Sequence, residues 1–324
     1  MKIAITGSTG SLGGALIAAL AHRTDVTRIV GLSRDEVKSG DLAERYADLP
    51  SLRCVLGDVR DERRLEEVFH GCDVVVHAAA LKKITQSVYS PSELVATNVQ
   101  GTINVIRAAI TAGVKKVVFI SSDKSPEATN LYGMTKAVAE CYAVQSNSYA
   151  TPRRCRVSAV RYGNVLLSRG SVVPFWRAQM ARGVPLTITD PTMTRFLLTL
   201  PQAAAFVLQA IADMEGGETL VPMLPSATLD DLATAVAGLD YPRQIVGLRP
   251  GGEKRHEALL SREEPPRTYR IGERFTILPS HHSWRAAWRW PEEAQPVHGS
   301  YTSDAPVRRL SIDEIRALLS GEPR

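Results

Sequence analysis

The sequence predicts an α/β fold in which a doubly wound parallel sheet is followed by a smaller C-terminal domain. Over the first half of the chain, short β-branched runs alternate with longer helical patterns, as in sheets whose strands are joined by covering helices. Beyond about residue 165 the alternation weakens, and proline and glycine recur. The length of 324 residues also exceeds what one hydrophobic core usually organises. We therefore expect domains at 1–165 and 166–263, with some segments of the second returning to the first, and an extension at 264–324.

Short apolar runs in the first half predict the strands of the sheet. They are Lys2–Thr6, Arg28–Ser33, Arg53–Gly57, Asp73–Ala78, Lys116–Ser121 and Arg156–Tyr162. Helical patterns lie between them at Leu12–His22, Asp61–Phe69, Ser92–Ala112 and Gly133–Ser146. In the second half, helices are expected at about 174–182, 201–214, 228–237 and Ile312–Leu319. This alternation predicts helices on both faces of a parallel sheet. The tail from about residue 264 contains Trp284, Trp288 and Trp290, and no pattern in it indicates a topology.

The charge of the chain is modest and dispersed. Lys and Arg give a formal net charge of +5, and the sequence pI is about 9.1. The sequence contains no basic run with interleaved aromatic residues, so we expect no nucleic-acid partner. A small positive excess suits an enzyme whose ligands carry phosphate groups.

The cysteines and the apolar runs indicate the compartment. Cys54, Cys72, Cys141 and Cys155 form no Cys-x-x-Cys pair and no metal-ligand spacing, so we expect reduced thiols and no metal site. The chain leads from Met1 straight into a strand pattern, and no apolar run is long enough for a signal peptide or a bilayer span. These features predict a cytoplasmic protein that does not insert into membranes.

A glycine-rich segment, TGSTGSLG, joins the first predicted strand to the first helix. Glycines let the backbone approach a pyrophosphate, and a helix N-terminus offers free N–H groups and the positive end of the helix dipole. The alternative is a glycine-rich turn without a ligand, but the flanking strand and helix favour a Rossmann-type, NAD(P)-binding domain. The GxxGxxG spacing is that of short-chain dehydrogenases. The candidate cofactor contacts are Gly7, Ser8, Thr9, Gly10, Ser11, Leu12 and Gly13.

The end of the second predicted strand bears on the choice of cofactor. NAD-binding proteins place an acidic side chain there for the ribose hydroxyl, whereas NADP-binding proteins favour a cation. Ser33 followed by Arg34 favours the 2′-phosphate of NADP, because a guanidinium forks onto phosphate oxygens. Asp35 keeps NAD possible, and Arg34 could instead pair with Asp35 on the surface.

A tyrosine and a lysine four residues apart begin the helix predicted at Gly133–Ser146. At this spacing Tyr132 and Lys136 lie one helical turn apart on one face. A neighbouring ammonium lowers a phenol pKa from about 10 toward the working range, so that the phenolate can take a proton from a sugar hydroxyl. The hydroxyl of Ser122 can share that proton. Together with the glycine segment, these residues predict an enzyme.

Several longer runs resemble one family. HAAALKKITQSVYSPSELVATNVQGT, SSDKSPEATNLYGMTK, RYGNVLLSRGSVVPFW, TDPTMTRF and RPGGEKRHE are similar to the inverting UDP-N-acetylglucosamine 4,6-dehydratases. These enzymes form part of the polysaccharide-biosynthesis branch of the extended short-chain dehydrogenase/reductases. The resemblance runs from Met1 to about residue 260, and a YTSD segment at Tyr301–Asp304 resembles the longer members. The most specific motif is Asp123-Lys124, since retaining sugar-nucleotide dehydratases carry Asp-Glu there.

The resemblance implies oxidation at C4 of a UDP-sugar, loss of water across C5 and C6, and reduction at C6. Tyr132 would take the C4 hydroxyl proton, Lys124 would be the base at C5, and Asp123 would protonate the leaving group. These roles require a neutral Lys124 and a protonated Asp123. The cations Lys82 and Lys136 would push the pKa of Lys124 in the required direction. Two alternatives remain: in an extended segment adjacent residues point to opposite sides unless the chain turns at 122–124, and Asp123 and Lys124 could simply form an ion pair.

The resemblance also implies supporting contacts. Further cofactor candidates are Asp58, Val59, Ala78, Ala79, Ala80, Lys82, Asn98, Tyr162 and Asn164. Substrate candidates are Lys82, Asn164, Arg169, Val173, Arg195, Arg249, Lys254, His256 and Glu257. Each has an ordinary alternative: packing for the alanines, a helix-bracing amide for Asn98, a solvated surface cation for each arginine or lysine, and a capped helix start for His256 and Glu257.

The chain departs from the family pattern at three places. Lys83 stands where the family has His, and Val88 stands where an acidic residue is usual. An extra glycine enlarges the Arg-Pro-Gly-Glu run to contain Gly251 and Gly252. The first two positions would line the sugar pocket, so the hexose or its 2-substituent could differ. The third could shift a loop that grips the nucleotide.

The sequence therefore predicts an NADP-dependent UDP-sugar 4,6-dehydratase, a lyase. A nucleotide-sugar epimerase or 4-oxidoreductase on the same fold is the alternative, and a non-catalytic NADP-binding regulator is a third hypothesis. We further expect a homo-oligomer, a dimer or larger, associating through the helices that begin near Ser92 and Gly133.

Overall fold

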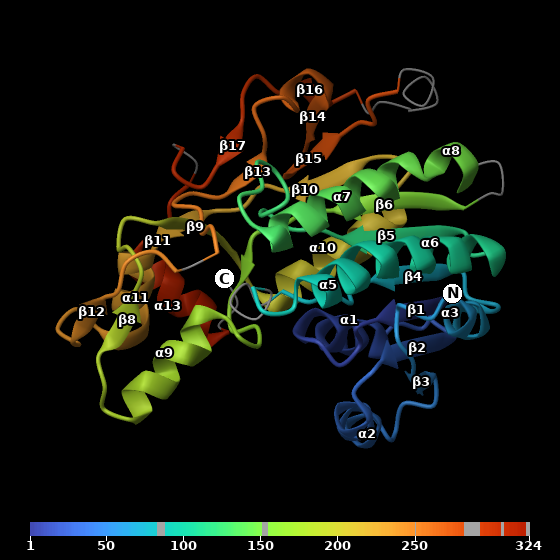
Figure 1. Cartoon of the computed structure of the whole chain (residues 1–324), viewed down its shortest axis with the longest axis horizontal. Coiled ribbons are helices and arrows are strands. Elements are labelled where there is room, and N and C mark those ends of the chain that lie inside the picture. Colours follow the sequence, from blue (N-terminus) through green and yellow to red (C-terminus); the bar gives the residue numbers. More distant parts are fainter. Residues whose placement is uncertain (83–87, 151–154, 250, 282–291, 306–307, 322–324) are drawn as a thin grey trace.

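The computed structural model describes residues 1–82, 88–150, 155–249, 251–281, 292–305 and 308–321. Within these residues a ten-stranded sheet runs through the molecule in the order β16-β14-β15-β10-β6-β5-β4-β1-β2-β3 (Figure 1). Its parallel part comprises β1 (Lys2–Thr6), β2 (Arg28–Ser33), β3 (Leu52–Leu56), β4 (Val74–His77), β5 (Lys116–Ile120), β6 (Arg156–Val160) and β10 (Thr219–Pro222). The strand order reverses between β1 and β4, which is where α/β sheets bind their ligands.

Helices cover both faces of the sheet. They are α1 (Ser11–Ala21), α2 (Glu36–Arg45), α3 (Glu62–Phe69), α5 (Pro91–Val95), the π-helix η1 (Ala96–Gln100), α6 (Gly101–Thr111), α7 (Leu131–Gln145), α8 (Asn147–Ala150) and α10 (Leu200–Asp213). Successive strand residues point to opposite faces. Accordingly, Ile3 and Ile5 of β1 join the cluster under α1 and α10, whereas Ala4 joins the cluster under α3, α6 and α7. The sheet is therefore doubly wound, which confirms the predicted fold class.

The C-terminal half forms a smaller unit around a third apolar cluster that contains Trp176. Its helices are α9 (Val172–Ala181), α11 (Leu229–Ala237) and α13 (Ile312–Ser320). Its strands are β7 (Asn164–Val165), β8 (Leu186–Ile188), β9 (Thr194–Leu198), β11 (Ser226–Thr228), β12 (Arg243–Ile245), β13 (Ala258–Leu260) and β17 (Tyr301–Thr302). The boundaries at residues 165 and 263 stay a proposal.

Several C-terminal segments extend the main sheet. Beyond β10, the antiparallel strands β15 (Arg274–Ile277), β14 (Thr268–Ile271) and β16 (Gln295–Pro296) follow, with the short 3₁₀-helix η3 (Pro265–Arg267) before β14. The tail, which had no expected topology, thus lies partly along the sheet edge (Figure 1). The tryptophans at 284, 288 and 290 lie outside the described residues.

The predicted elements agree with the structure within about two residues at most ends, with two differences. The helix α2 was not predicted, because its sequence EVKSGDLAER is polar and carries only a narrow apolar face. The helix expected at Ser92–Ala112 contains a π-helical turn, where the side-chain amide of Asn98 bonds the backbone of Leu81. Within the described part of the chain, none of the helices has the length and apolar character needed to cross a bilayer.

Candidate active site

The glycine segment forms a turn between β1 and α1 that has no space for a side chain at Gly7 or Gly13 and little at Gly10. Gly7 has φ +73°, and a Cβ there would lie 2.8 Å from the backbone nitrogen of Ala79. A Cβ at Gly13 would lie 2.4 Å from the carbonyl oxygen of Gly7, and one at Gly10 would lie 3.0 Å from the same atom. The first turn of α1, which the structure describes in full, carries no acidic side chain. This helix N-terminus is therefore suited to an anion.

A cleft opens above this turn, which we call the glycine crevice. It is lined by Gly7, Thr9, Gly10, Leu32, Ser33, Arg34, Asp35, Gly57, Val59, Ala78, Ala79, Ala80 and Thr97. Small residues leave room for a flat ligand, and the hydroxyl oxygens of Ser8 and Thr97 are buried with no hydrogen-bond partner among the described residues. These features fit a dinucleotide, whose phosphates and ribose hydroxyls offer partners for buried polar atoms.

The rim of the crevice brings Ser33 and Arg34 together as the sequence predicts. The hydroxyl groups of Ser33 and Thr9 are hydrogen-bonded at 2.8 Å. Asp35 instead caps α2, where its carboxylate accepts from the backbone N–H of Lys38 at 3.0 Å. Arg34 does not pair with Asp35; its guanidinium lies 3.4 Å from Asp58 and remains 44% exposed.

The contacts of Asp58 and Asn98 are mainly structural. The carboxylate of Asp58 accepts hydrogen bonds from the guanidinium of Arg60. The amide of Asn98 accepts from Leu81 N at 2.8 Å and donates to Leu81 O at 2.9 Å and to the Thr135 hydroxyl at 3.1 Å. Asn98 therefore braces the chain that leaves the crevice against α7, as the helix-bracing alternative anticipated. No contact here tests its predicted role toward a cofactor.

The helix α7 presents Tyr132 and Lys136 as buried side chains, 8% and 4% exposed. Asn130 caps this helix by accepting from Gly133 N at 2.9 Å. The Lys136 ammonium donates to the carbonyl of Ile120 and lies 4.3 Å from the Phe119 ring centre, and burial lowers its pKa to about 7.

The expected effect of Lys136 on Tyr132 is wrong in this structure. Burial raises the pKa of Tyr132 above its ordinary value, and the groups that oppose this rise are Lys124 and Ser122, not Lys136. The reason is geometric: the Lys136 ammonium points to the end of β5 and bonds the backbone there. The cation that favours the phenolate is Lys124.

A tight turn follows β5 and brings Asp123 and Lys124 to one side. Ser125 N donates to Ser122 O at 3.0 Å, closing the turn. The Asp123 oxygen Oδ1 accepts from the Ser122 hydroxyl at 2.9 Å and from the Lys124 ammonium at 3.0 Å. Asp123 is 1% exposed, and its Oδ2 is buried with no partner among the described residues. The turn that the catalytic hypothesis required is present, and so is the ion pair of the alternative.

Lys124 also contacts a second carboxylate. Its Nζ lies 3.2 Å from Glu257 Oε1, and Glu257 is 2% exposed. Burial of Lys124 favours the neutral amine, but the charges of Asp123 and Glu257 outweigh it and raise the pKa of Lys124. The expectation that Lys82 and Lys136 would bring Lys124 to its neutral form is wrong in its net result, although Lys82 and Lys124 do repel each other. It failed because Glu257, 133 positions further along the sequence, supplies a negative charge that the local sequence does not reveal.

A buried ionic group beneath the turn was missed by the sequence analysis. Glu140 accepts hydrogen bonds from the hydroxyls of Ser121 and Ser125, the residues flanking the turn. Arg161 donates to Glu140 and, at 2.9 Å and 3.0 Å, to Glu264. Glu140 lies on α7 one helical turn beyond the Tyr-x-x-x-Lys motif, and this spacing is the one sequence signal that could have identified it. The group holds the turn against α7.

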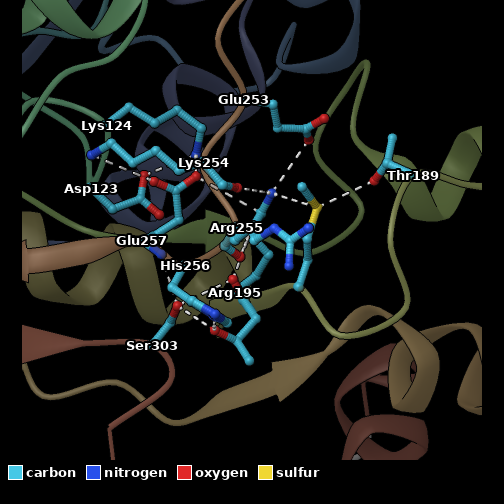
Figure 2. A network of polar contacts seen from close by, with 12 residues as sticks. Asp123, Lys124, Thr189, Arg195, Glu253, Lys254, Arg255, His256, Glu257 and Ser303 are labelled. Atoms are coloured by element: carbon cyan, nitrogen blue, oxygen red, sulfur yellow. Dashed lines mark hydrogen bonds and ion pairs between the residues drawn. The ribbon is translucent and has the colours of Figure 1, made fainter. Parts of the chain in front are cut away.

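The loop that precedes β13 carries four of the nine predicted substrate residues, of which Figure 2 shows Lys254, His256 and Glu257. Arg195 is buried, and its guanidinium donates to the carbonyls of Arg255 and Lys254 at 2.9 Å and 3.1 Å and to Glu253 at 3.3 Å. Arg249 pairs with Glu253 and is 58% exposed. The Lys254 ammonium donates to Pro126 O. The cations Arg195, Arg249 and Lys254 thus all lie at the loop before β13, but the guanidinium of Arg195 is already hydrogen-bonded to the loop itself.

His256 and Ser303 complete this network. His256 Nδ1 is 2.8 Å from the Thr194 hydroxyl, which is 2.7 Å from the Ser303 hydroxyl. The Ser303 hydroxyl also accepts from Glu257 N at 2.9 Å. The YTSD segment thus reaches the candidate site through Ser303 (Figure 2). Neither His256 nor Glu257 begins a helix, so the alternative of a capped helix start is wrong.

The other predicted residues are scattered around the site. Arg169 lies against the glycine turn, where its guanidinium donates to Thr9 O and its backbone N–H to the Ser11 hydroxyl at 2.9 Å. Val173 is 1% exposed and belongs to the apolar cluster of the smaller unit. The oxygen Oδ1 of Asn164 is buried with no partner among the described residues.

Tyr162 and Lys82 lie closer to the charged groups. The carbonyl of Tyr162 accepts from Asp123 N at 3.0 Å. Partial desolvation and, next, the positive charges of Lys124 and Arg169 lower the pKa of Lys82. Lys82 is therefore close enough to be repelled by both Lys124 and Arg169, the second of which contacts the glycine turn.

The three departures from the family pattern are only partly visible. Lys83 lies outside the described residues. Val88 is 56% exposed. Gly252 has φ +82°, and its carbonyl accepts from the hydroxyl of Thr129 and from the side-chain amide of Asn130 at 3.1 Å. The extended glycine run therefore packs against the start of α7, close to Tyr132.

Comparison with known proteins places these features in a family. The family described as "Polysaccharide biosynthesis protein" matches residues 3–279. A curated UDP-N-acetylglucosamine 4,6-dehydratase (inverting) of Campylobacter jejuni is 40% identical over 280 residues, 86% of this chain and 83% of that protein. A curated UDP-glucose 4-epimerase of Rickettsia massiliae is 36% identical over 323 residues, 97% of this chain and 94% of that protein. The X-ray structure of Pen from Bacillus thuringiensis is 32% identical, with a TM-score of 0.91 and coverage of 99% and 97%.

Proposed function

The chain belongs to the family of polysaccharide biosynthesis proteins, and from this premise we propose that it is a nucleotide-sugar 4,6-dehydratase, a hydro-lyase. The substrate is UDP-N-acetylglucosamine or a close UDP-hexose, and the product is a 4-keto-6-deoxy sugar with C5 inverted. The observation that carries the proposal is the contact of 3.0 Å between Asp123 and Lys124 in a turn beside Tyr132. An acid and a base held next to each other suit elimination of water from neighbouring carbons.

The nicotinamide cofactor, when bound in the glycine crevice, supplies oxidation at C4 and reduction at C6. The residues do the proton chemistry. The phenolic oxygen of Tyr132 takes the C4 hydroxyl proton, with Ser122 and Lys124 favouring its ionised form. The new ketone makes the C5 proton acidic. The Lys124 amine then takes that proton as the C5–C6 double bond forms, and the departing hydroxide takes a proton from Asp123 and leaves as water.

The ion pair in the structure is the product state of this elimination. A neutral amine and a carboxylic acid enter the step, and an ammonium and a carboxylate leave it. Transfer of one proton from Lys124 to Asp123 across their 3.0 Å contact restores the reactive pair without any change in net charge. C5 gains its new proton from solvent as C6 is reduced, and Tyr132 releases the C4 hydroxyl proton to solvent, so the protons balance. The raised pKa of Lys124 is therefore compatible with its role as the base, provided that it exchanges its proton with Asp123.

The epimerase alternative has one observation in its favour, the relative from Rickettsia massiliae that matches 97% of the chain. Oxidation and reduction at C4 alone would need Tyr132 and a cofactor but no acid–base pair. The buried Asp123–Lys124–Glu257 group costs desolvation energy that such a reaction would not use. We therefore favour dehydration.

We propose NADP as the cofactor, with NAD possible. Two contacts support NADP. Asp35 is engaged as the cap of α2, so it is less available to a ribose hydroxyl. Arg34 lines the crevice with an exposed guanidinium that could fork onto a 2′-phosphate.

The UDP group and the assembly are also proposals. The cations Arg249 and Lys254, which belong to the loop before β13, are suited to the two phosphates of UDP. From the side of the glycine turn, Lys82 and Arg169 could reach the same ligand. We propose a homo-oligomer built on α7, because the apolar residues Met134 and Val138 of this helix are 49% and 53% exposed. Light scattering of the wild-type protein and of Val138→Glu would test this interface.

Incubation with UDP-N-acetylglucosamine in heavy water tests the reaction. Dehydration predicts that the sugar loses one water and gains one deuterium at C5, as observed by mass spectrometry and proton NMR. An unchanged mass with a changed C4 configuration would indicate the epimerase. A protein that binds the dinucleotide but turns over no nucleotide sugar would favour the NADP-binding regulator.

A further inference from the structure

Glu257 contacts the candidate base and has no assigned role in the chemistry. Its Oε1 lies 3.2 Å from Lys124 Nζ, nearly as close as Asp123 Oδ1 at 3.0 Å. Its other oxygen, Oε2, is buried with no hydrogen-bond partner among the described residues and lies 4.0 Å from Lys254 Nζ. One ammonium thus lies between two buried carboxylates, of which the elimination uses only Asp123.

The position of Glu257 is determined by its own loop and by two distant segments. Its backbone N–H donates to the Ser303 hydroxyl at 2.9 Å, and the same hydroxyl donates to Thr194 O at 3.1 Å. Arg195 Nε lies 3.8 Å from Glu257 Oε1. Because β9, the loop before β13 and the YTSD segment all restrain it, the carboxylate cannot move far from Lys124 (Figure 2).

From this geometry we propose that Glu257 is a positioning residue that holds Lys124 in place and sets the pH range in which its amine can accept the C5 proton. A fixed negative charge at 3.2 Å favours the ammonium over the amine. Asp123 alone cannot do this throughout the cycle, since it becomes neutral whenever it carries the proton for the leaving group. Glu257 therefore keeps one counter-charge next to Lys124 in both states of the pair.

The charges around Lys124 agree with this assignment. Asp123 and Glu257 raise the pKa of Lys124, opposing its burial, and Arg195 lowers it. The remaining groups that face it are Tyr132 from α7, Lys254 from the same loop as Glu257, and Lys82 from the segment after β4. Of the two carboxylates, only Glu257 has no proton to deliver in the proposed reaction.

The test is a pH titration of the Lys124 side chain in the wild-type protein and in Glu257→Gln. The titration is monitored by NMR of ¹³Cε-labelled lysine, and the Lys124 signal is assigned as the one that is absent from Lys124→Met. This measurement needs no substrate, whereas the inference itself rests on the proposed function. We expect Glu257→Gln to move the Lys124 titration by about 1 to 3 pH units toward acid. A Lys124 titration that stays in place would overturn the inference.

Kinetics give a second readout of the same idea. In the wild-type enzyme water loss needs the Asp123–Lys124 pair to carry one proton, so the rate falls as the pH rises through the Lys124 titration. In Glu257→Gln this fall should occur at lower pH by a similar shift. A raised KM with an unchanged pH profile would instead assign Glu257 to substrate binding and reject the positioning role. Failure of the proposed function would appear differently, as no water loss by the wild-type enzyme at any pH.

Two further variants separate charge from loop stability. Glu253→Gln removes a carboxylate that pairs with Arg195 at 3.3 Å in the same loop but does not contact Lys124. It should leave the Lys124 titration in place even if it weakens the loop. Glu257→Asp keeps the charge and should recover part of the shift. If Glu253→Gln moved the titration as far as Glu257→Gln, the effect would belong to the loop and not to Glu257.

Discussion

The two sides of the candidate site are built in opposite ways. The glycine crevice consists of small residues, and its turn leaves no space for side chains at Gly7 and Gly13. The charged cluster on the other side comprises Asp123, Lys124, Arg195, Glu253, Lys254 and Glu257, with most of its side chains buried. The crevice recognises a ligand through backbone groups and shape, whereas the cluster sets the protonation of reacting groups. Shape is needed where a cofactor only has to be held, and charge is needed where protons move.

The substitution Tyr132→Phe, on the charged side of the site, should cause the largest loss of activity. Removal of one hydroxyl deletes the group that takes the C4 proton, and general acid–base catalysis contributes about 10²–10⁴-fold to rates. We expect kcat to fall within that range while dinucleotide binding, measured by fluorescence, is unchanged. Tyr142→Phe on the same helix should stay within about twofold of wild type. A Tyr132→Phe enzyme with near-normal turnover would remove Tyr132 from the mechanism.

The substitution Gly13→Ala should distort the turn of the glycine crevice. Its Cβ would lie 2.4 Å from Gly7 O and 2.6 Å from Ser8 Cα, so the turn must shift. We expect loss of dinucleotide affinity and about 1–3 kcal/mol of stability, measured by calorimetry and chemical denaturation. Gly14→Ala is the matched control, since a Cβ there meets nothing within 4 Å and alanine favours a helix by roughly 0.5–1 kcal/mol. Equal effects of the two substitutions would contradict the role of the tight turn.

On the crevice side, the titratable residue His77 is held in its neutral form, in contrast to the charged groups of the other side. It is buried between the hydroxyls of Thr6 and Thr102, and burial lowers its pKa to about 3. As the pH falls below about 6.5, His77 binds a proton in the unfolded chain but stays neutral in the folded protein, so the free energy of unfolding decreases. Between pH 7 and pH 5 this loss should be about 2 kcal/mol. Denaturation curves of His77→Gln should lack this component; an identical pH dependence in both proteins would argue against a neutral His77.

Arg34→Ala should give the smallest effect, a change in cofactor preference. Loss of the guanidinium should weaken NADP binding by about tenfold, or about 1.4 kcal/mol, and leave NAD binding unchanged. Arg28→Ala, at the opposite end of β2, is the control. Equal losses for NADP and NAD, measured by isothermal titration, would reject Arg34 as the contact for the 2′-phosphate.

The predictions from sequence differed in success between the two sides. The glycine turn, Ser33 and Arg34 are where they were expected, because they belong to one strand–turn–helix unit and the end of the next strand, and short-range steric rules govern such units. The charge of Lys124 was predicted wrongly because Glu257 lies far away in the chain, and the pKa of Tyr132 because tertiary packing sets its burial and the direction of the Lys136 side chain. Glu264 was missed because its partner Arg161 lies 103 positions away, whereas Glu140 had a local signal, its place one helical turn beyond Lys136.

The amino-acid sequence alone determined the doubly wound sheet, the dinucleotide turn and the Tyr132/Lys136 spacing. These follow from periodicity and from the local conformations that glycine permits. Only the tertiary structure decided which carboxylates surround Lys124 and that Ser303 of the tail anchors one of them. The physical reason is that charge interactions depend on distance in space and on burial, and both are set when segments more than a hundred residues apart pack together.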